Sequence, residues 1–472
     1  MAKSNLSKME FNKKSSFILL TLLLILPLLV FLVKKNQNLF LKASEKPANI
    51  VIDSTVNLGT HNFPWRALAQ GGEEKENMLE PVIGQTLFLT PKYIRIDHIY
   101  DFYDVVKREN GDLSFNFEKL DRIVEDILLT GALPFLSLSY MPEVLSVGDI
   151  VDQPKSWQEW ELLVKETVSH YSGKDKKAIP GVIYEVWNEP DLFGNWKMYG
   201  KKNYSLLYYH TVKAAQSVEN TQRFEIGGPS TTAPYKTWVD DFLSYVFENN
   251  LRIDFYSWHR YSKNPNDFLG DIDKIDSWLF KNAGYTIPKY ITEWGSDSEN
   301  SPLHDSSFDA AHLIAVMSKI LQRVDLAFVF EIKDGLSPNK EKYWGRWGLL
   351  THELAGPVEK KPKYFALQML NQMDGNVISL KGENSFINGF ATKEKNNVNI
   401  ILSNLDENNL HSESFPLTIN NLESGNYKIK IKNLDNIEEE KIIATENSSI
   451  SQNLFLKPND VILLKLEKIN TQ

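Results

Sequence analysis

The chain has 472 residues, of which 42% are hydrophobic and 12% aromatic, and its formal net charge is −9 at neutral pH. This length exceeds one ordinary domain but fits an α/β barrel of about 300 residues with a smaller module. The acidic balance argues against nucleic acid as a partner, and the lack of cysteine excludes disulfides, thiolate metal sites and cysteine nucleophiles.

The N-terminal part carries a targeting signal. A polar, basic segment at residues 1–16 precedes an uncharged apolar run at residues 17–33, which lacks the polar face of a buried helix. The run is near the lower length limit for spanning, and only a poor cleavage site follows at residues 42–44. We therefore expect an uncleaved single-pass anchor in the cell membrane, with residues 1–16 in the cytoplasm. A tether at residues 34–48 then leads to a folded part outside; a signal peptide and a secreted protein are the alternative.

From residue 49 onward, short strands rich in β-branched and aromatic residues alternate with segments of helical periodicity. The expected strands lie at residues 50–58, 92–100, 133–138, 182–187, 223–228, 253–261, 290–294 and 326–332. The expected helices lie at residues 117–129, 157–171, 204–218, 238–249 and 308–321. This alternation predicts a (β/α)8 TIM barrel over residues 49–372, with its site at the C-terminal ends of the strands.

The last hundred residues have a different pattern. After about residue 373, glycine, asparagine and serine separate short runs in which apolar residues recur with a period of two. This pattern is typical of antiparallel strands with one buried face. We therefore predict a small antiparallel β-sandwich over residues 373–472.

Two of the expected strands end in a glutamate. Residues 182–190 read VIYEVWNEP, and Pro190 cannot continue a ladder, so Glu189 is expected at the strand tip. Residues 289–295 read KYITEWG and place Glu293 similarly. Glu189 alone fits a solvated loop glutamate equally well, but two carboxylates at one barrel edge form the pair that glycoside hydrolysis needs. The nine histidines show no metal-binding spacing, so we expect no metal and no other cofactor.

Taken together, these motifs resemble glycoside hydrolase family 39, in clan A of the (β/α)8 glycosidases, over most of the barrel. The similar stretches follow the family's order and lie at residues 134–143, 184–192, 227–229, 253–259 and 292–294. The family, which includes β-xylosidases, α-L-iduronidases and exopolysaccharide hydrolases, also has a C-terminal β-sandwich. The resemblance implies that Glu189 is the acid/base and Glu293 the nucleophile.

The resemblance also implies roles for four neighbours of these glutamates. Asn188 would contact the 2-hydroxyl of the substrate, and Arg95 would keep Glu293 ionised. His259 and Tyr261 lie two residues apart and so share one strand face, where they would serve the acid/base and the nucleophile respectively.

Two positions depart from the family pattern. Asp97 stands where many members have a histidine, and Phe330 stands where clan members commonly have a tryptophan. Both positions would contact the sugar, so they affect the expected substrate more than the expected reaction. Trp294 and Phe330 are predicted to line the barrel mouth.

The sequence therefore predicts a retaining glycoside hydrolase that cleaves an oligo- or polysaccharide by double displacement. Its two carboxyl groups are expected about 5–5.5 Å apart. One alternative is a catalytically inactive carbohydrate-binding barrel, against which the retained glutamate pair argues. The other is a transglycosylase that remodels surface glycans with the same carboxylates.

Overall fold

The computed structural model describes residues 46–71, 74–75, 78–445 and 447–469. The anchor predicted at residues 17–33 and the basic segment at residues 1–16 lie outside the described residues. Within the described part of the chain, no helix has the length and apolar character needed to cross a bilayer.

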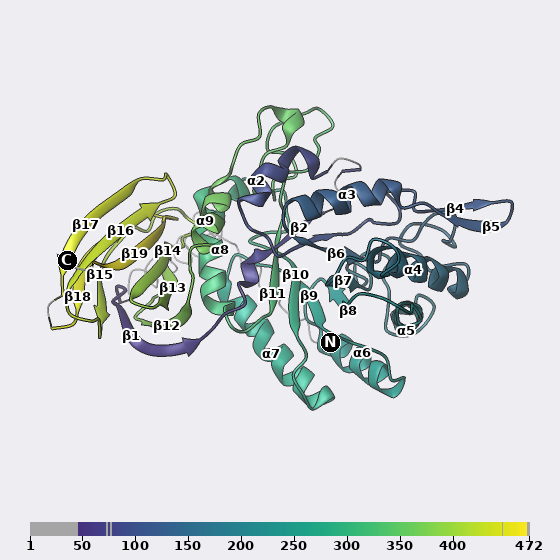
Figure 1. Ribbon diagram of the computed structural model, residues 1–472, viewed down its shortest axis with the longest axis horizontal. Helices are drawn as coiled ribbons and strands as arrows, with labels where there is room; N and C mark the ends of the chain where they lie inside the picture. The colour runs from purple at the N-terminus through teal and green to yellow at the C-terminus, as the bar shows by residue number, and fades with distance from the viewer. Residues whose placement is uncertain (1–45, 72–73, 76–77, 446, 470–472) are drawn as a thin grey trace, which may run out of the picture. The chain divides into compact units, whose positions relative to one another are not determined.

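Eight parallel strands close into a barrel in the order β10-β11-β2-β3-β6-β7-β8-β9 (Figure 1). Their bounds are β2 (Ala67–Gln70), β3 (Tyr93–Ile96), β6 (Leu133–Ser137), β7 (Val182–Glu185), β8 (Phe224–Thr231), β9 (Tyr256–Tyr261), β10 (Lys289–Gly295) and β11 (Leu326–Phe330). Successive barrel strands are neighbours in space, so the carboxyl ends of all eight meet at one face. The predicted (β/α)8 barrel is confirmed, together with seven of its eight strands.

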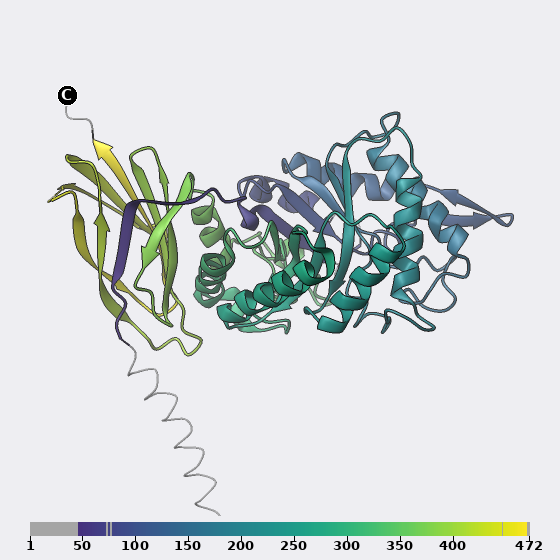
Figure 2. The ribbon, with the colours of Figure 1, turned by 90° about the horizontal axis from the view of Figure 1, so that it is seen from below.

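Helices cover the outside of the barrel (Figures 1 and 2). Their bounds are α2 (Ile83–Leu87), α3 (Glu118–Leu129), α4 (Trp157–Ser172), α5 (Tyr204–Gln216), α6 (Lys236–Glu248), α7 (Pro265–Ala283), α8 (Ser307–Ile320) and α9 (Pro362–Leu370). Helix α3 illustrates why they form, because its buried residues recur at helical spacing and present one apolar stripe to the strands. These buried residues are Leu120, Ile123, Val124 and Ile127.

The barrel interior is packed below the site. A separate buried cluster joins alternate residues of the strands, among them Phe135, Phe255 and Phe328. The rings of Phe135 and Phe328 meet edge-on with their centroids 4.7 Å apart. Ala67 and Ala69 of β2 belong to the same cluster. Their side chains are small, and the large rings of the other strands fill the space beside them. Polar groups at the strand ends therefore rest on an apolar floor.

The strand expected at residues 50–58 is real but does not belong to the barrel. Strand β1 (Ile50–Gly59) pairs antiparallel with β12 (Asn376–Lys381) and parallel with β15 (Glu413–Asn420). The prediction that it opens the barrel is therefore wrong, and β2, in a region expected to be a loop, takes that place. Along β1 the first residues alternate between buried and half-buried, whereas all four residues of β2 are buried. Alternation is typical of a sheet with one covered face, and full burial of a barrel strand.

Strand β1 lies within a nine-stranded, mainly antiparallel C-terminal sheet in the order β17-β16-β19-β14-β13-β12-β1-β15-β18. The other strands of this sheet are β13 (Ile387–Glu394), β14 (Asn397–Asn404), β16 (Asn426–Asn433), β17 (Glu438–Ala444), β18 (Ile450–Leu456) and β19 (Val461–Ile469). Figure 2 shows β1 running along this sheet before the chain crosses to the barrel. The domain limits 49–372 and 373–472 stay a prediction, with β1 added to the C-terminal sheet.

Candidate active site

Arg95, at the end of β3, connects three strands of the barrel. Its Nε donates to Glu185 Oε2 at 2.8 Å, its Nη1 to Glu293 Oε1 at 2.7 Å and its Nη2 to Asn188 Oδ1 at 2.7 Å. Burial lowers the pKa of Arg95, but Glu185 and Glu293 more than offset this and hold it above its ordinary value. The guanidinium therefore stays charged, and its planar fork fixes the positions of its partners.

Glu293 lies near the end of β10 and is buried. Besides Arg95, it accepts a hydrogen bond from Tyr261 Oη at 3.0 Å on Oε2, and His259 Nδ1 lies 3.5 Å from the same oxygen. Burial raises the pKa of the Glu293 carboxyl, while His259 and Arg95 act to lower it, and the net direction is upward. The carboxylate is thus held by donors on both oxygens, as a positioned nucleophile requires.

Glu189 follows β7 in a sharp turn. Its φ of 44° and that of Trp187, 74°, are in the left-handed region, which is uncommon for residues other than glycine. The backbone N–H of Glu189 donates to the carbonyl of Ser230 at 3.0 Å, and its Oε1 lies 2.8 Å from His259 Nδ1. The turn ends the strand earlier than expected and directs the carboxylate toward His259.

The two glutamates and His259 form one compact group. A carboxylate oxygen of each glutamate and a ring nitrogen of His259 all lie within 4.8 Å of one another. Inverting enzymes hold their carboxyl groups roughly 6.5–9.5 Å apart to fit a water, whereas retaining enzymes hold them about 5–5.5 Å apart. The nearest oxygens of the two glutamates are therefore close, and the separation of 5–5.5 Å between the carboxyl groups stays a prediction.

His259 is fully buried on β9 between the carboxylates and Ser230. Its Nε2 lies 2.9 Å from Ser230 Oγ, while Nδ1 faces both glutamates. Burial lowers the pKa of His259, but Glu293 and Glu189 outweigh burial and raise it. The imidazole can therefore hold a proton on Nδ1, which faces both carboxylates. The contact of Nε2 with Ser230 fixes the orientation of the ring.

The side chain of Asn188 makes three hydrogen bonds within the protein. Its Oδ1 accepts from Arg95, and its Nδ2 donates to Tyr140 Oη at 2.8 Å and to Asp97 Oδ2 at 3.2 Å. The other oxygen of Asp97, Oδ1, is buried and has no hydrogen-bond partner among the residues that the structure describes. The structure thus places Asp97 beside the group around Arg95, which brings a fourth carboxylate to the site, besides Glu185, Glu189 and Glu293.

The two aromatic residues predicted at the mouth behave differently. Trp294 is buried and packs edge-on against Phe268, with centroids 5.6 Å apart. The expectation that it lines the mouth is wrong, because Glu293 points inward and the next residue on a strand points outward. Phe330 is half-buried at the end of β11, with its ring centroid 6.2 Å from that of Tyr261 and 6.2 Å from that of Trp347. It lies beside Tyr261, the partner of Glu293, and its role in lining the mouth stays a prediction.

Four contact residues were not predicted: Tyr140, Glu185, Ser230 and Trp347. Glu185 stands four residues before Glu189 in the quoted motif, Tyr140 lies within the similar stretch at residues 134–143, and Ser230 directly follows the one at residues 227–229. The quoted stretches therefore point to these residues, but their contacts depend on the register between neighbouring strands. Glu185 pairs with Ser137 on one side and with Gly227 on the other. At Gly227, an added Cβ would lie 2.4 Å from the carbonyl oxygen of Phe255, so only glycine fits there.

Two groups of described residues bring one histidine and two carboxylates close enough to ligate a cation: Glu189 with His259 and Glu293, and Glu74 with His352 and Glu353. In each group, a basic side chain already forms an ion pair with at least one of the carboxylates and offsets part of their negative charge. Arg95 contacts Glu293 in the first. In the second, Lys333 Nζ lies 2.8 Å from Glu74 and 3.1 Å from Glu353.

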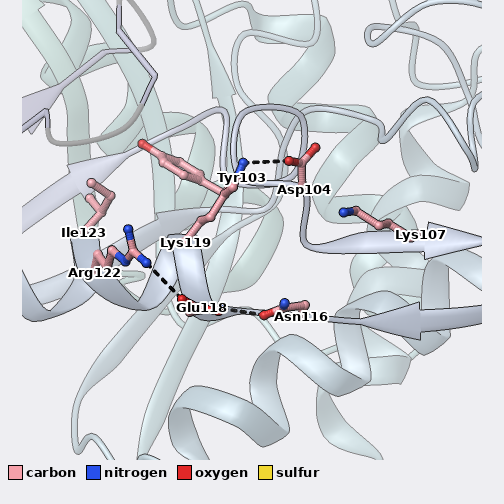
Figure 3. A pocket seen from close by; sticks show the side chains of 8 residues that line it. All are labelled: Tyr103, Asp104, Lys107, Asn116, Glu118, Lys119, Arg122 and Ile123. Atoms are coloured by element: carbon pink, nitrogen blue, oxygen red, sulfur yellow. Dashed lines mark hydrogen bonds and ion pairs between the residues drawn. The ribbon is translucent and has the colours of Figure 1, made fainter.

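A surface pocket of about 260 Å³ is separate from these side chains (Figure 3). Its walls carry charges of both signs, and Lys119 pairs with Asp104, and Arg122 with Glu118, within it. The lining residues are Tyr103, Asp104, Lys107, Asn116, Glu118, Lys119, Arg122 and Ile123. None of the candidate catalytic residues lines it.

Comparison with known proteins gives a consistent result. The sequence profile described as glycosyl hydrolases family 39 matches residues 81–441. The chain is 27% identical over 328 residues to a β-xylosidase of Caldicellulosiruptor saccharolyticus, covering 63% of this chain and 65% of that protein. It is 27% identical over 303 residues to a β-xylosidase of Geobacillus stearothermophilus, covering 57% and 58% respectively. The matches thus span less than two thirds of these relatives.

The fold is shared with a solved protein as well. The crystal structure of a monomeric β-xylosidase from Caulobacter crescentus superposes with a TM-score of 0.76 at 21% identity. The superposition covers 90% of this chain and 100% of that one. It therefore includes both the barrel and the C-terminal sheet.

Proposed function

Because the chain belongs to glycosyl hydrolases family 39, we propose that it is a retaining glycosidase that cleaves O-glycosidic bonds of an oligo- or polysaccharide. The observation that carries the proposal is the pair Glu189 and Glu293, which bring one carboxylate oxygen each to within 4.8 Å of each other. The two carboxylates also have different partners. Glu293 is held by Arg95 and Tyr261, and Glu189 contacts His259.

These partners assign the two roles. A nucleophile must be ionised, and Glu293 has a permanent cation and a hydroxyl donor on its oxygens. Glu293 attacks the anomeric carbon while Glu189 protonates the leaving oxygen, which gives a covalent glycosyl-enzyme. Glu189 then takes a proton from water, and the water displaces Glu293, so the sugar leaves with its original configuration.

A β-xyloside is the first substrate to test. Both curated relatives are β-xylosidases, and this chain shares their family. Asp97 and Phe330 adjoin the catalytic group and differ from the family pattern, so they are the positions at which the sugar preference of this chain would diverge. The proposal is therefore β-xylosidase-like activity, with the preferred sugar set by these side chains.

Two further features are proposed for the rest of the chain. The uncharged run at residues 17–33 supports a single-pass anchor with the enzyme outside the cell membrane, where it would act on a surface or exported glycan. The nine-stranded sheet supports a β-sandwich, because β15 and β18 alternate buried with more exposed residues, and sheets of this size tend to fold over.

The roles of the two glutamates can be tested by rescue. Glu293→Ala should abolish turnover of every xyloside, because no covalent intermediate can form. Glu189→Ala should retain the first step on aryl xylosides with good leaving groups, which need no proton, and azide should speed its second step. Equal behaviour of the two variants on good and poor leaving groups would refute the assignment. Complete inactivity of the parent protein, with retained sugar binding, would favour a binding barrel.

A further inference from the structure

The loop after Glu189 presents large apolar side chains to solvent. Leu192 is 59% exposed and Phe193 is 41% exposed. The loop is nevertheless tied to the acid/base, because the backbone N–H groups of Leu192 and Phe193 donate to the carbonyl of Glu189 at 3.0 and 2.8 Å. The position of Phe193 is therefore set by the same turn that positions Glu189.

The inner side of Phe193 packs against the active site. Its ring meets that of Tyr140 edge-on, with centroids 5.9 Å apart and an angle of 83° between the planes. Tyr140 in turn accepts the hydrogen bond of Asn188. The carbonyl of Phe193 accepts from Trp187 Nε1 at 3.4 Å. One side of the ring is thus fixed beside the reaction centre, while the rest is open.

A second exposed ring comes from the neighbouring loop. Tyr235, which stands directly before α6, is 42% exposed. Its Oη lies 3.0 Å from Thr232 Oγ1, and Thr232 donates to Asp191 through both its backbone N–H and its hydroxyl. Asp191 is two residues from Glu189, so the loops after β7 and β8 are joined next to the acid/base.

The role proposed for Glu189 indicates which part of a substrate would lie near these loops. A general acid must reach the glycosidic oxygen, so the leaving group lies on the Glu189 side of the scissile bond. Single exposed apolar residues are ordinary on protein surfaces, but here they lie on two joined loops, one of which carries the acid/base. Flat aromatic rings offer a large apolar contact area at low entropic cost, and ligand-binding sites commonly contain them.

We propose that Phe193 and Tyr235 bind the sugar on the leaving-group side of the scissile bond, a surface that we call the leaving-group platform. The proposal rests on the proposed glycosidase function and names the residues of this chain that would recognise the leaving group. The substrate is a glycan that continues beyond the cleaved bond, rather than a glycoside with a small leaving group.

The test compares two substrates in the full-length protein. Xylotriose carries sugars on the leaving-group side, whereas xylosyl fluoride has the same reacting sugar and no ring to place there. Phe193→Ala and Tyr235→Ala should each lower the ratio of kcat/KM for xylotriose to kcat/KM for the fluoride by roughly two- to tenfold. Phe193→Tyr, which keeps a ring, should restore most of the ratio.

Tyr285→Ala is the matched control, because Tyr285 is an exposed tyrosine between α7 and the N-terminal end of β10, away from the strand ends that carry the glutamates. Its ratio should equal that of the parent protein. An unchanged ratio in the two platform variants would overturn the proposal, and so would a parent that cleaves the fluoride but not xylotriose. In both cases the glycosidase function would stand. A parent that cleaves neither xylosyl substrate would overturn the β-xylosidase-like function, and the platform with it.

Discussion

Arg95 donates through Nε to Glu185 Oε2 at 2.8 Å, in an ion pair that neither side chain shares with solvent. The same guanidinium contacts Glu293, the proposed nucleophile, through Nη1, so Glu185 helps to determine where the cation lies relative to Glu293. Glu185 would not touch substrate, and we regard it as a positioning residue.

Removing Glu185 should destabilise the protein. Glu185→Leu leaves the Nε of a buried guanidinium without an acceptor, which costs about 3–5 kcal/mol of the free energy of unfolding. Glu185→Gln keeps an oxygen acceptor and should cost less. Urea unfolding of both variants measures the difference. In the Leu variant, kcat should also fall by a larger factor than KM changes. Equal stability of the two variants would show that the oxygen acceptor at position 185 does not contribute to stability.

Asp97 should set the acidic limit of activity. Burial is the main reason that the pKa of Glu293 is raised, and the negative charge of Asp97 raises it further. Glu293 must be ionised to attack, so activity falls as the pH drops through that pKa. Asp97→Asn removes the charge and keeps an amide oxygen for Asn188, so the acidic limb of kcat/KM should move to lower pH. The exposed Asp112 provides the control Asp112→Asn, and a shift to higher pH would contradict the argument.

Tyr261→Phe should slow catalysis without unfolding the barrel. The lost hydrogen bond from Oη to Glu293 is to a charged group, which is worth about 1.5–3 kcal/mol. If the bond helps to place the nucleophile, kcat/KM should fall roughly tenfold to a hundredfold. Tyr290→Phe is the matched control, because Tyr290 donates to Glu225 at 2.7 Å at the opposite end of the same strand, β10. Similar losses in both variants would indicate a general effect on stability.

Strand β1 should contribute to stability rather than to chemistry. Ile52 is fully buried in the C-terminal sheet, where it pairs with Leu380 and Ile419. Ile52→Ala should lower the free energy of unfolding by about 2–5 kcal/mol. Leu58→Ala, on the exposed part of the same strand, should change it by less than about 0.5 kcal/mol. Both variants should keep the kcat of the parent at temperatures where they remain folded.

Most of the barrel could be predicted because its strands are short apolar runs that end in polar residues. Glu189, Glu293, Arg95 and His259 all stand at such ends, and the structure brings them together. The first barrel strand could not be predicted, because β2 has four residues and no β-branched residue among them. Residues 50–59 have the stronger strand composition, but pairing with residues far along the chain leaves no local signal.

The outward direction of Trp294 could have been predicted from the sequence, whereas the contacts of Tyr140, Ser230 and Glu185 could not. Once Glu293 is taken to point into the barrel, its neighbour must point outward, and the alternation of strand side chains says so without a structure. The contacts of Tyr140 and Ser230 depend instead on how neighbouring strands align, which one sequence does not specify. The same holds for Glu185, which pairs with Arg95 across a strand that lies between them.

The placement of β1 also affects the order in which the protein can be completed during synthesis. Val51 pairs with Lys381, and Ile50 with Leu417, so the first strand has no partner until almost the whole chain has emerged from the ribosome. A product that stops after the barrel would keep every candidate catalytic side chain but leave both edges of β1 open. Open strand edges promote aggregation and attract chaperones and proteases. Incomplete chains would therefore be removed even though their active-site residues are all present.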